Sequence, residues 1–385
     1  MRFPVLSFLL LFCTFANAQQ NTAHTLVHQG YTRNFLVHTP PGYNPAIKYP
    51  VVFVLHGGGL GTGPQVQNNS GMDKVADTAK FITVYPDALN TNWADGRSNQ
   101  SDDAGIDDVG FVSAMIDFLL TSYSIDATMV YSCGMSNGAF MSNRLAIDLS
   151  DRIAAIGAVA GTMGESLAQR FPPANPMPFI GFHGTSDTYV PYNGGAVLLI
   201  RGNALGAEEV AGMYAGFGGC GVTPVITDIT NSNLLDMSTV KKYTYTNCNS
   251  GTEVVLFKIN NGGHTWPGGT RLLTFGSTNM DINASAELWK FFKTKKRPGA
   301  PTVAGSASSA VSETLSHIYP NPATTEITVQ YLGKTQLVIT DKSGVTYPVK
   351  VTGVQGKNKK IDVSGLRSGE YVLKFGDKTE RFWIR

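Results

Sequence analysis

Up to about residue 295, blocks of apolar residues predict buried strands, and amphipathic stretches between them predict helices. Residues 49–55 (YPVVFVL) form a continuous β-branched and aromatic run, which is typical of a central strand buried on both faces. Similar runs lie at 81–85, 128–133, 153–160 and 178–183, and helical stretches lie at 108–120, 137–149 and 282–294. This alternation predicts an α/β domain with a mostly parallel central sheet.

The pattern changes after residue 295. Residues 296–314 contain Pro298-Gly299-Ala300-Pro301 and then a run of Ala, Ser, Gly and Val, which is the composition of a flexible linker. Short strands separated by turn residues follow at 327–331, 336–340, 371–375 and 381–384. Residues 315–385 are therefore expected to form a small all-β sandwich.

The N-terminus has the pattern of a secretory signal peptide. Arg2 supplies the positive start, residues 5–15 form a short apolar run, and Ala16-Asn17-Ala18 fits the small-x-small cleavage pattern. We expect residues 1–18 to be removed, which leaves residues 19–295 as the domain that carries the chemistry. A buried N-terminal helix is the alternative.

Charge is unevenly distributed along the chain. The formal net charge is +2, but the residues from Leu315 onward contain 11 Lys and Arg against 6 Asp and Glu, so that segment carries +5 and the rest −3. The sequence has no basic stripe with interleaved aromatic residues, and nucleic acid is therefore not an expected partner.

The four cysteines have different expected roles. Cys13 leaves with the signal peptide. Cys220 and Cys248 lie in polar loops containing Gly and Asn, where an exported protein can form a disulfide. Cys133 lies in an apolar run and is expected to be an inert buried thiol.

A G-x-S-x-G motif at 134–138 carries the first indication of chemistry. It follows a predicted buried strand and opens a predicted helix, which is the setting of a nucleophile elbow. Its glycines permit a sharp turn, and the helix N-terminus favours developing negative charge. Ser136 is therefore the expected nucleophile.

A nucleophilic serine needs a base and an acid, which follow an elbow serine in the order Ser, then Asp or Glu, then His. His264 lies in a glycine-dense loop after the strand-like residues 253–259, and we expect it to be the base. Asp187 follows the strand-like residues 177–182 and is the expected acid, which holds the His264 tautomer. Asp151 is the rival carboxylate, but it directly follows the elbow helix.

His56-Gly57-Gly58-Gly59 follows the first central strand, where this fold takes its second oxyanion donor. We expect the backbone N–H groups of Gly58 and Asn137 to form the oxyanion hole, with Gly59 as the alternative to Gly58, and His56 to orient the loop. The sequence has no clustered metal-ligand spacing, GxGxxG motif or P-loop, so no metal and no cofactor are expected.

Trp93 and Trp266 are the candidate substrate contacts, with ordinary packing as the alternative for both. Trp266 lies two residues after the expected base, where a ring can stack on a phenolic or sugar group. Trp289, in the last helix, is expected in the core. Asp107 or Asp108 is expected to be the N-cap of the helix at 108–120.

Several motifs together resemble the secreted esterase / poly(3-hydroxybutyrate) depolymerase family, which neighbours feruloyl and acetylxylan esterases. They are LHGGGLG, VYPDA, DDVGF, VYSCGMSNGAF, HGTSDTYVPY, GGHTWPGG and DINASAELWKFF, in the family's order, over residues 29–293. The resemblance implies an α/β-hydrolase fold and the triad Ser136, Asp187 and His264. It also implies a bridge between Cys220 and Cys248. Many depolymerase relatives have a cysteine where this chain has Gly58, which keeps the backbone donor but departs from that subtype.

The tail resembles the C-terminal sorting domain of type IX secretion, on the segments YPNPAT at 319–324 and IDVSGLRSGEYVL at 361–373. This resemblance implies an extracellular or cell-surface protein of a Gram-negative bacterium, exported by the type IX machinery. A small carbohydrate-binding or adhesion sandwich is the alternative, but the short, basic composition favours sorting.

Together these observations predict a secreted serine ester hydrolase that acts on plant cell-wall esters, either feruloyl or acetylxylan. An extracellular polyester depolymerase of the polyhydroxyalkanoate type is the alternative. A third hypothesis, from another class, is a non-catalytic binding or surface protein on a hydrolase scaffold.

Overall fold

The computed structural model describes residues 20–297 except 60, 199–201, 250 and 272, and residues 315–385 except 320–321, 332–336, 356–357 and 376–377. The expected signal peptide (1–18) and most of the expected linker (296–314) lie outside the described residues. The chain divides into two compact units, Met1–Pro301 and Thr302–Arg385.

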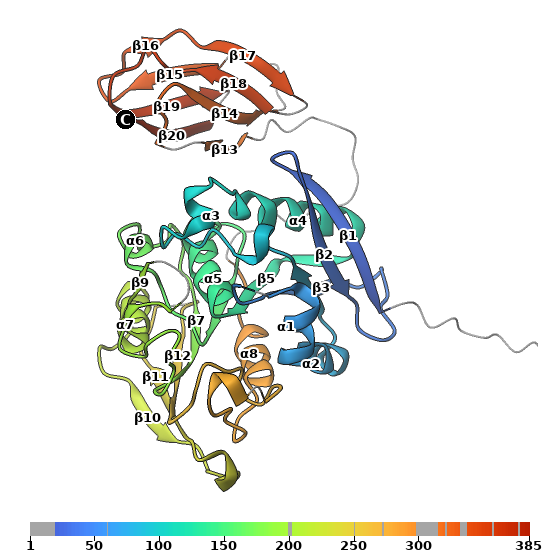
Figure 1. Cartoon of the computed structure of the whole chain (residues 1–385). Helices are drawn as coiled ribbons and strands as arrows, with labels where there is room; N and C mark the ends of the chain where they lie inside the picture. The colour runs from blue at the N-terminus through green and yellow to red at the C-terminus, as the bar shows by residue number, and fades with distance from the viewer. Residues whose placement is uncertain are drawn as a thin grey trace, which may run out of the picture. The chain divides into compact units, whose positions relative to one another are not determined.

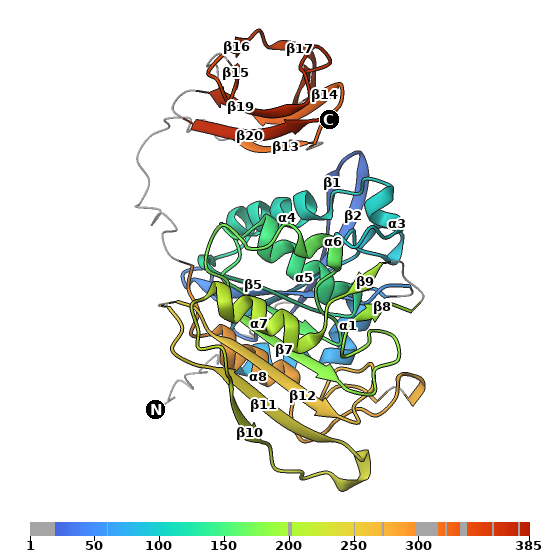
Figure 2. The ribbon, with the colours of Figure 1, turned by 90° about the vertical axis from the view of Figure 1, so that its left-hand side faces the viewer.

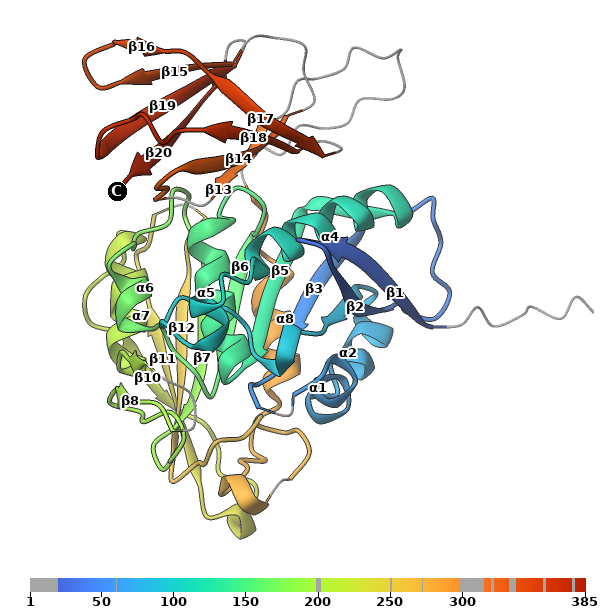
Figure 3. The ribbon, with the colours of Figure 1, turned by 45° about the horizontal axis from the view of Figure 1, so that its top comes forward.

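Within its described residues, the first unit is built on a ten-stranded mixed sheet with the order β1-β2-β4-β3-β5-β6-β7-β12-β11-β10 (Figures 1 and 2). Strand pairs from β4 to β12 in this order are parallel, and those at both edges are antiparallel (Figure 3). The strands are β1 (Asn21–His28), β2 (Tyr31–His38), β3 (Tyr49–Leu55), β4 (Ile82–Pro86), β5 (Ile125–Met135), β6 (Ala155–Val159), β7 (Phe179–Gly184), β10 (Val225–Asp228), β11 (Thr239–Tyr245) and β12 (Val254–Asn260), and a separate small pair is formed by β8 (Gly195–Ala196) and β9 (Asn203–Ala204).

Helices cover both faces of this sheet (Figure 1). Residues of α4, α5 and α7 pack on one face, and residues of α1, α2 and α8 pack on the other. The helical segments are α1 (Gly63–Ser70), α2 (Met72–Ala79), η1 (Leu89–Thr91), α3 (Gln100–Asp103), α4 (Asp108–Ser122), α5 (Asn137–Asp148), α6 (Glu165–Ala168), α7 (Ala207–Phe217), η2 (Leu234–Asp236), η3 (Leu273–Phe275) and α8 (Ala284–Phe292).

The side chains of β3 explain its unbroken apolar run. Phe53 and Leu55 point into the core beneath α4 and α5, whereas Val52 and Val54 point into the core beneath α2 and α8. Because alternate side chains of a strand lie on opposite faces, a strand covered on both sides needs apolar residues at every position. This confirms the expected α/β architecture with a mostly parallel sheet, which has the strand order of an α/β-hydrolase.

The winding of the sheet reverses between β3 and β5. The chain passes from β3 outward to β4, then returns to β5 and continues outward through β6, β7 and β12. In open α/β sheets, ligands bind at the carboxyl ends of the strands beside such a reversal. The end of β3 carries His56 to Gly58, and the end of β5 carries Ser136, so the fold brings both expected segments to this place.

Within its described residues, the second unit consists of two four-stranded antiparallel sheets that share one apolar core. Ile327, Val329 and Ile361 from one sheet and Ile339, Leu373 and Phe382 from the other contribute to it. This confirms the expected small all-β region. The strands are β13 (Leu315–Tyr319), β14 (Glu326–Tyr331), β15 (Leu337–Asp341), β16 (Thr346–Tyr347), β17 (Lys350–Gln355), β18 (Asn358–Asp362), β19 (Gly369–Phe375) and β20 (Lys378–Ile384).

Candidate active site

Ser136 occupies a sharp turn between β5 and α5. Its backbone has φ 54° and ψ −120°, a conformation that residues other than glycine rarely adopt. Its N–H donates to the carbonyl oxygen of Val159 at 2.9 Å, and its own carbonyl accepts from the N–H groups of Ala139 and Phe140, which opens the helix. The turn presents a half-buried serine at the carboxyl end of the sheet, which is the geometry of a nucleophile elbow.

Both glycines of the motif are required by close packing against the end of β3. A Cβ atom on Gly138 would lie 2.3 Å from the carbonyl oxygen of Leu55, and a Cβ atom on Gly134 would lie 2.5 Å from the backbone of Gly138. These distances are well inside van der Waals contact. The spacing of the motif therefore lets the loop after β3 approach the serine.

That loop passes directly beside Ser136. A Cβ atom on Gly57 would lie 3.4 Å from Cβ of Ser136. The N–H of Gly59 already donates to Oδ1 of Asn92 at 3.1 Å, which favours Gly58 over Gly59 as the oxyanion donor. Asn137 opens α5, where the amide groups of the first turn have no partner within the helix.

Two hydrogen bonds of His56 hold this loop in place. Its Nε2 accepts from the N–H of Ala88 at 3.0 Å, and its Nδ1 donates to the carbonyl oxygen of Gly57 at 2.7 Å. Burial lowers the pKa of His56, so the ring is neutral at pH 7, as one accepting and one donating nitrogen require.

His264 and Asp187 meet because they follow neighbouring parallel strands, β12 and β7. Nδ1 of His264 lies 2.8 Å from Oδ2 of Asp187, and both side chains are buried. Oδ1 of Asp187 accepts from the N–H groups of Tyr189 and Val190, both at 2.9 Å. These bonds fix the carboxylate and assign the Nδ1–H tautomer to His264, which leaves Nε2 as its basic nitrogen.

The structure brings Asp187 and His264 into direct contact, but it does not join the serine to them. Among the hydrogen bonds between described residues, none links Oγ of Ser136 to His264. Serine–histidine bonds of hydrolases are often long without substrate, since they tighten when the complex forms.

Comparisons with known proteins match the two parts of the chain to different families. Residues 34–169 match the family described as Esterase PHB depolymerase. This match lies within the first unit, which we call the esterase unit. Residues 317–384, within the second unit, match the family described as Secretion system C-terminal sorting domain.

Individual relatives are similar over the esterase unit. "Putative esterase NocK" of Nocardia uniformis subsp. tsuyamanensis is 29% identical over 281 residues, which cover 69% of this chain and 80% of that protein. "Feruloyl esterase B" of Piromyces equi is 29% identical over 242 residues, which cover 60% of this chain but 42% of that protein. Among solved structures, an acetyl xylan esterase from Aspergillus awamori is 14% identical with a TM-score of 0.48, and the alignment covers 71% of this chain and 99% of that one.

The two tryptophans expected to contact substrate are core residues of the esterase unit, and that expectation is corrected here. Trp93 is 0% exposed, and its indole N–H donates to the carbonyl oxygen of His56 at 3.0 Å. Trp266 is 2% exposed, and its indole N–H donates to Oγ of Ser285 in α8 at 3.1 Å. Both rings pack inside the fold and present no face to a ligand.

Two other aromatic residues lie beside the expected base. The ring of Tyr189 stacks on the His264 imidazole with centroids 5.0 Å apart, and the ring of Phe275 lies 6.1 Å from the imidazole and 5.3 Å from Tyr189. Both rings are half-buried. Neither ring was expected at the site from the sequence, although Tyr189 follows the expected acid by two residues within the HGTSDTYVPY motif.

The remaining cysteine and capping predictions can be checked directly. Cys220 and Cys248 form the expected disulfide. Cys133 is a free, buried cysteine, and burial raises the pKa of its thiol, which makes it inert. Asp107 caps α4 by accepting from the N–H of Gly110 at 2.8 Å.

Within the described ranges, no three His, Cys, Asp or Glu side chains are grouped to hold a metal ion. In the same ranges, every helix is too short or too polar to cross a membrane.

Proposed function

We propose that the esterase unit is a serine carboxylic ester hydrolase that works through an acyl-enzyme. Oγ of Ser136 attacks the ester carbonyl while Nε2 of His264 takes its proton. The amides of Gly58 and Asn137 donate to the oxyanion, and His264 then protonates the leaving alcohol. Water activated by His264 releases the acid, and Asp187 stabilises the imidazolium in both steps.

The proposal is supported by two observations: the bond between His264 and Asp187, and the positive φ of the elbow serine Ser136. Among the described residues, the hydrogen bonds that Asp187 accepts come from N–H groups, so its carboxylate is suited to stabilise a positive ring. The loop after β3 and the N-terminus of α5 converge on the same serine, as an oxyanion hole requires.

The decisive test compares the wild-type protein with Ser136→Ala in hydrolysis of a short p-nitrophenyl ester and in labelling by a fluorophosphonate. We expect both activities to disappear in the variant while its thermal unfolding is unchanged. Near-normal turnover in Ser136→Ala would refute the nucleophile. Absence of labelling and turnover in the wild-type protein would favour the hypothesis of a non-catalytic scaffold.

For the substrate, we propose a plant cell-wall ester, with a feruloyl group favoured over an acetyl group. Several of the matched relatives are named feruloyl esterases. The half-buried rings of Tyr189 and Phe275 beside His264 supply an aromatic surface on which a hydroxycinnamoyl ring can stack.

This substrate is tested with Tyr189→Ala and Phe275→Ala on methyl ferulate and on p-nitrophenyl acetate. We expect kcat/KM for methyl ferulate to fall about 2- to 10-fold more than for the acetate, which is the size of one aromatic contact. Equal losses on both esters would contradict a ring contact. Release of acetate from acetylated xylan without ferulate release would select the acetylxylan alternative.

A polyester is the second candidate substrate, because an apolar segment is exposed near the base. Leu234, Leu235 and Met237 are 75%, 89% and 75% exposed. Two hydrogen bonds connect this segment to the residue before His264. Oγ of Ser277 donates to the carbonyl oxygen of Asp236, and the carbonyl oxygen of Ser277 accepts from the N–H of Gly263. Clearing of poly(3-hydroxybutyrate) film that is lost in Leu234→Ser/Leu235→Ser, while p-nitrophenyl ester turnover persists, would support this substrate.

For export, we propose that residues 1–18 are a signal peptide, that 296–314 link the two units, and that the type IX machinery recognises 315–385. Mass spectrometry of the protein secreted by a host with this machinery is expected to find Gln19 as the first residue. Deletion of 315–385 is expected to stop secretion. Continued secretion of the truncated protein would favour the adhesion hypothesis for the tail.

A further inference from the structure

Asn137 contributes two groups to different parts of the site. Its backbone amide is the proposed oxyanion donor, whereas its side chain is buried and turned toward the segment after η1. Oδ1 of Asn137 accepts from the N–H of Trp93 at 2.7 Å, and its Nδ2 donates to the carbonyl oxygen of Trp93 at 3.2 Å and to Oδ2 of Asp95 at 2.5 Å. The residue next to the nucleophile is therefore held by three bonds from one short segment.

The same segment also holds the other side of the proposed oxyanion hole. The indole N–H of Trp93 donates to the carbonyl oxygen of His56 at 3.0 Å, and the two rings lie 5.0 Å apart. His56 precedes Gly57 and Gly58 in the loop that passes Ser136. Trp93 thus contacts both segments that carry the proposed oxyanion donors. Its backbone bonds to the side chain of Asn137, and its indole bonds to His56 in the glycine loop.

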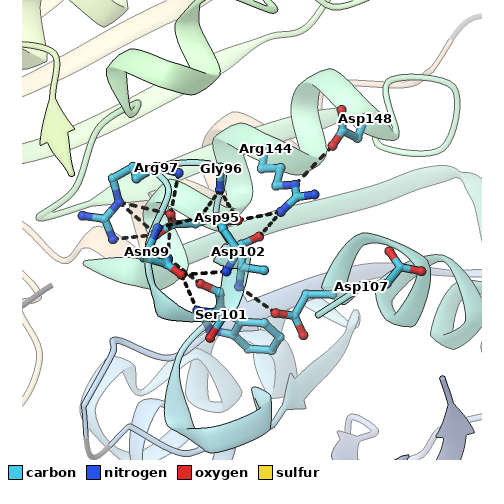
Figure 4. A network of polar contacts seen from close by, with 12 residues as sticks. Asp95, Gly96, Arg97, Asn99, Ser101, Asp102, Asp107, Arg144 and Asp148 are labelled. Carbon is cyan, nitrogen blue, oxygen red and sulfur yellow. Dashed lines mark hydrogen bonds and ion pairs between the residues drawn. The ribbon is translucent and has the colours of Figure 1, made fainter. Parts of the chain in front are cut away.

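Buried charges keep this segment rigid. Asp95 and Arg97 form a fully buried ion pair in which Oδ2 of Asp95 lies 2.5 Å from Nη2 and 3.0 Å from Nε of Arg97. Nδ2 of Asn99 donates to Oδ1 of Asp95 and to the carbonyl of Trp93, both at 2.9 Å. Figure 4 shows Asp95, Arg97 and Asn99 turned toward one another.

The ion pair is also packed against the nucleophile helix. The guanidinium carbon of Arg97 lies 3.7 Å from the ring centroid of Phe140 in α5. A Cβ atom on Gly164 would lie 2.1 Å from Cγ of Arg97, so the absence of a side chain at Gly164 leaves the room that Arg97 occupies. Burying two charges is costly in solvation, and removing one partner of such a pair leaves an uncompensated buried charge.

From this geometry we propose that Trp93 and Asp95 are positioning residues that set the distance between the two amide donors of the oxyanion hole. The inference rests on the proposed serine mechanism. Neither side chain touches the reacting atoms. Asp95 holds Asn137 and the elbow, Trp93 holds His56 and the glycine loop, and Arg97 with Asn99 prevents the segment from shifting.

The test uses Trp93→Phe, which keeps a large ring but removes the indole N–H, and Asp95→Asn, which keeps the shape but removes the charge. With p-nitrophenyl acetate we expect kcat per titrated active serine to fall about 10- to 100-fold, because small displacements of oxyanion donors have effects of this size. KM is expected to stay within about 3-fold, since the ground-state ester does not use these donors fully.

A second readout is specific to the oxyanion. Sulfur is a weak hydrogen-bond acceptor, so the thionoester analogue of p-nitrophenyl acetate depends less on the two amides. The ratio of ester to thionoester turnover is therefore expected to shrink about 10-fold in both variants. A variant that is merely less stable would lose both activities equally.

Asp117→Asn is the matched control. Oδ1 of Asp117 in α4 accepts from Nη2 of Arg152 at 2.6 Å, and among the hydrogen bonds between described residues none joins Asp117 or Arg152 to residues 92–99. We expect its turnover ratio to equal that of the wild-type protein. Ratios in Trp93→Phe and Asp95→Asn that equal the control would overturn the inference, whereas full activity in Ser136→Ala would instead overturn the mechanism on which it rests.

Discussion

Nδ1 of His264 lies 2.8 Å from Oδ2 of Asp187, although 77 residues separate them in the chain. The contact forms because β7 and β12 are parallel neighbours, so the loops at their carboxyl ends share one edge of the sheet. The approach is close: a Cβ atom on Gly184 would lie 2.2 Å from the carbonyl oxygen of Gly262. The acid and the base are thus placed by the sheet rather than by their local sequence.

Replacement of the acid tests this contact. Asp187→Asn keeps one oxygen for the amides of Tyr189 and Val190 but presents an NH₂ group to Nδ1 of His264, which favours the wrong tautomer. We expect kcat to fall by about 10⁴ with little change in stability. The control is Asp151→Asn, because Asp151 is an exposed carboxylate beyond α5. A larger loss in the control than in Asp187→Asn would transfer the role to Asp151.

The pH dependence of stability is expected to report on His183. This ring is buried, its Nε2 donates to the carbonyl of Val190 at 2.8 Å, and burial lowers its pKa although the Asp187 carboxylate acts in the opposite direction. In the unfolded chain the pKa is about 6.5, so below that pH the unfolded state binds the additional proton and stability is lost as pH falls toward the folded pKa.

His183→Gln removes this titration. Urea unfolding at pH 7.5, 6 and 5 is expected to show the wild-type advantage over the variant shrinking with acidity, by about 1.4 kcal/mol for each unit of pKa depression. An advantage that is constant or grows toward pH 5 would show that His183 is not buried in its neutral form.

The disulfide between Cys220 and Cys248 joins the loop after α7 to the loop after β11 across a sequence separation of 28. Closing a loop of this size restricts the unfolded chain, and its loss is expected to cost roughly 3 kcal/mol. The measurement is urea unfolding of Cys220→Ser/Cys248→Ser and of the wild-type protein with and without reductant. Reduced wild-type protein should unfold like the double variant, and identical oxidised and reduced curves would argue against the bridge.

Alanine substitutions at two helical glycines, one in the elbow and one in α7, are expected to have opposite effects on stability. Gly138→Ala would place Cβ 2.3 Å from the carbonyl of Leu55, and we expect a loss of about 2–3 kcal/mol together with most of the activity. Gly212 in α7 has nothing within 4 Å of its Cβ position, so Gly212→Ala is expected to stabilise by about 0.5–1 kcal/mol. Thermal unfolding distinguishes the two, and equal shifts would contradict the packing argument.

Local sequence patterns predicted much of the framework. The run at 49–55 coincides with β3, and the expected helix at 108–120 falls within α4 (Asp108–Ser122). The change of composition after 295 separated the α/β domain from the all-β region. These features can be predicted from the sequence because each produces a local pattern within about a dozen residues. This holds for a strand covered on both faces, for a helix with one buried face and for a turn. The domain boundaries themselves stay predictions.

The sequence by itself determined the order of the motifs that carry the chemistry and the elements on which they lie. These are an elbow serine, a loop aspartate, a loop histidine and a glycine loop after a strand. Only the tertiary structure decided which aromatic rings are available. Trp93 and Trp266 are buried, whereas Tyr189 and Phe275 lie beside His264. It also decided that Asn137 is bonded to Asp95, 42 residues earlier. The physical reason is that a residue's type and local period fix its secondary structure, while its partners depend on how distant segments cross in the folded chain.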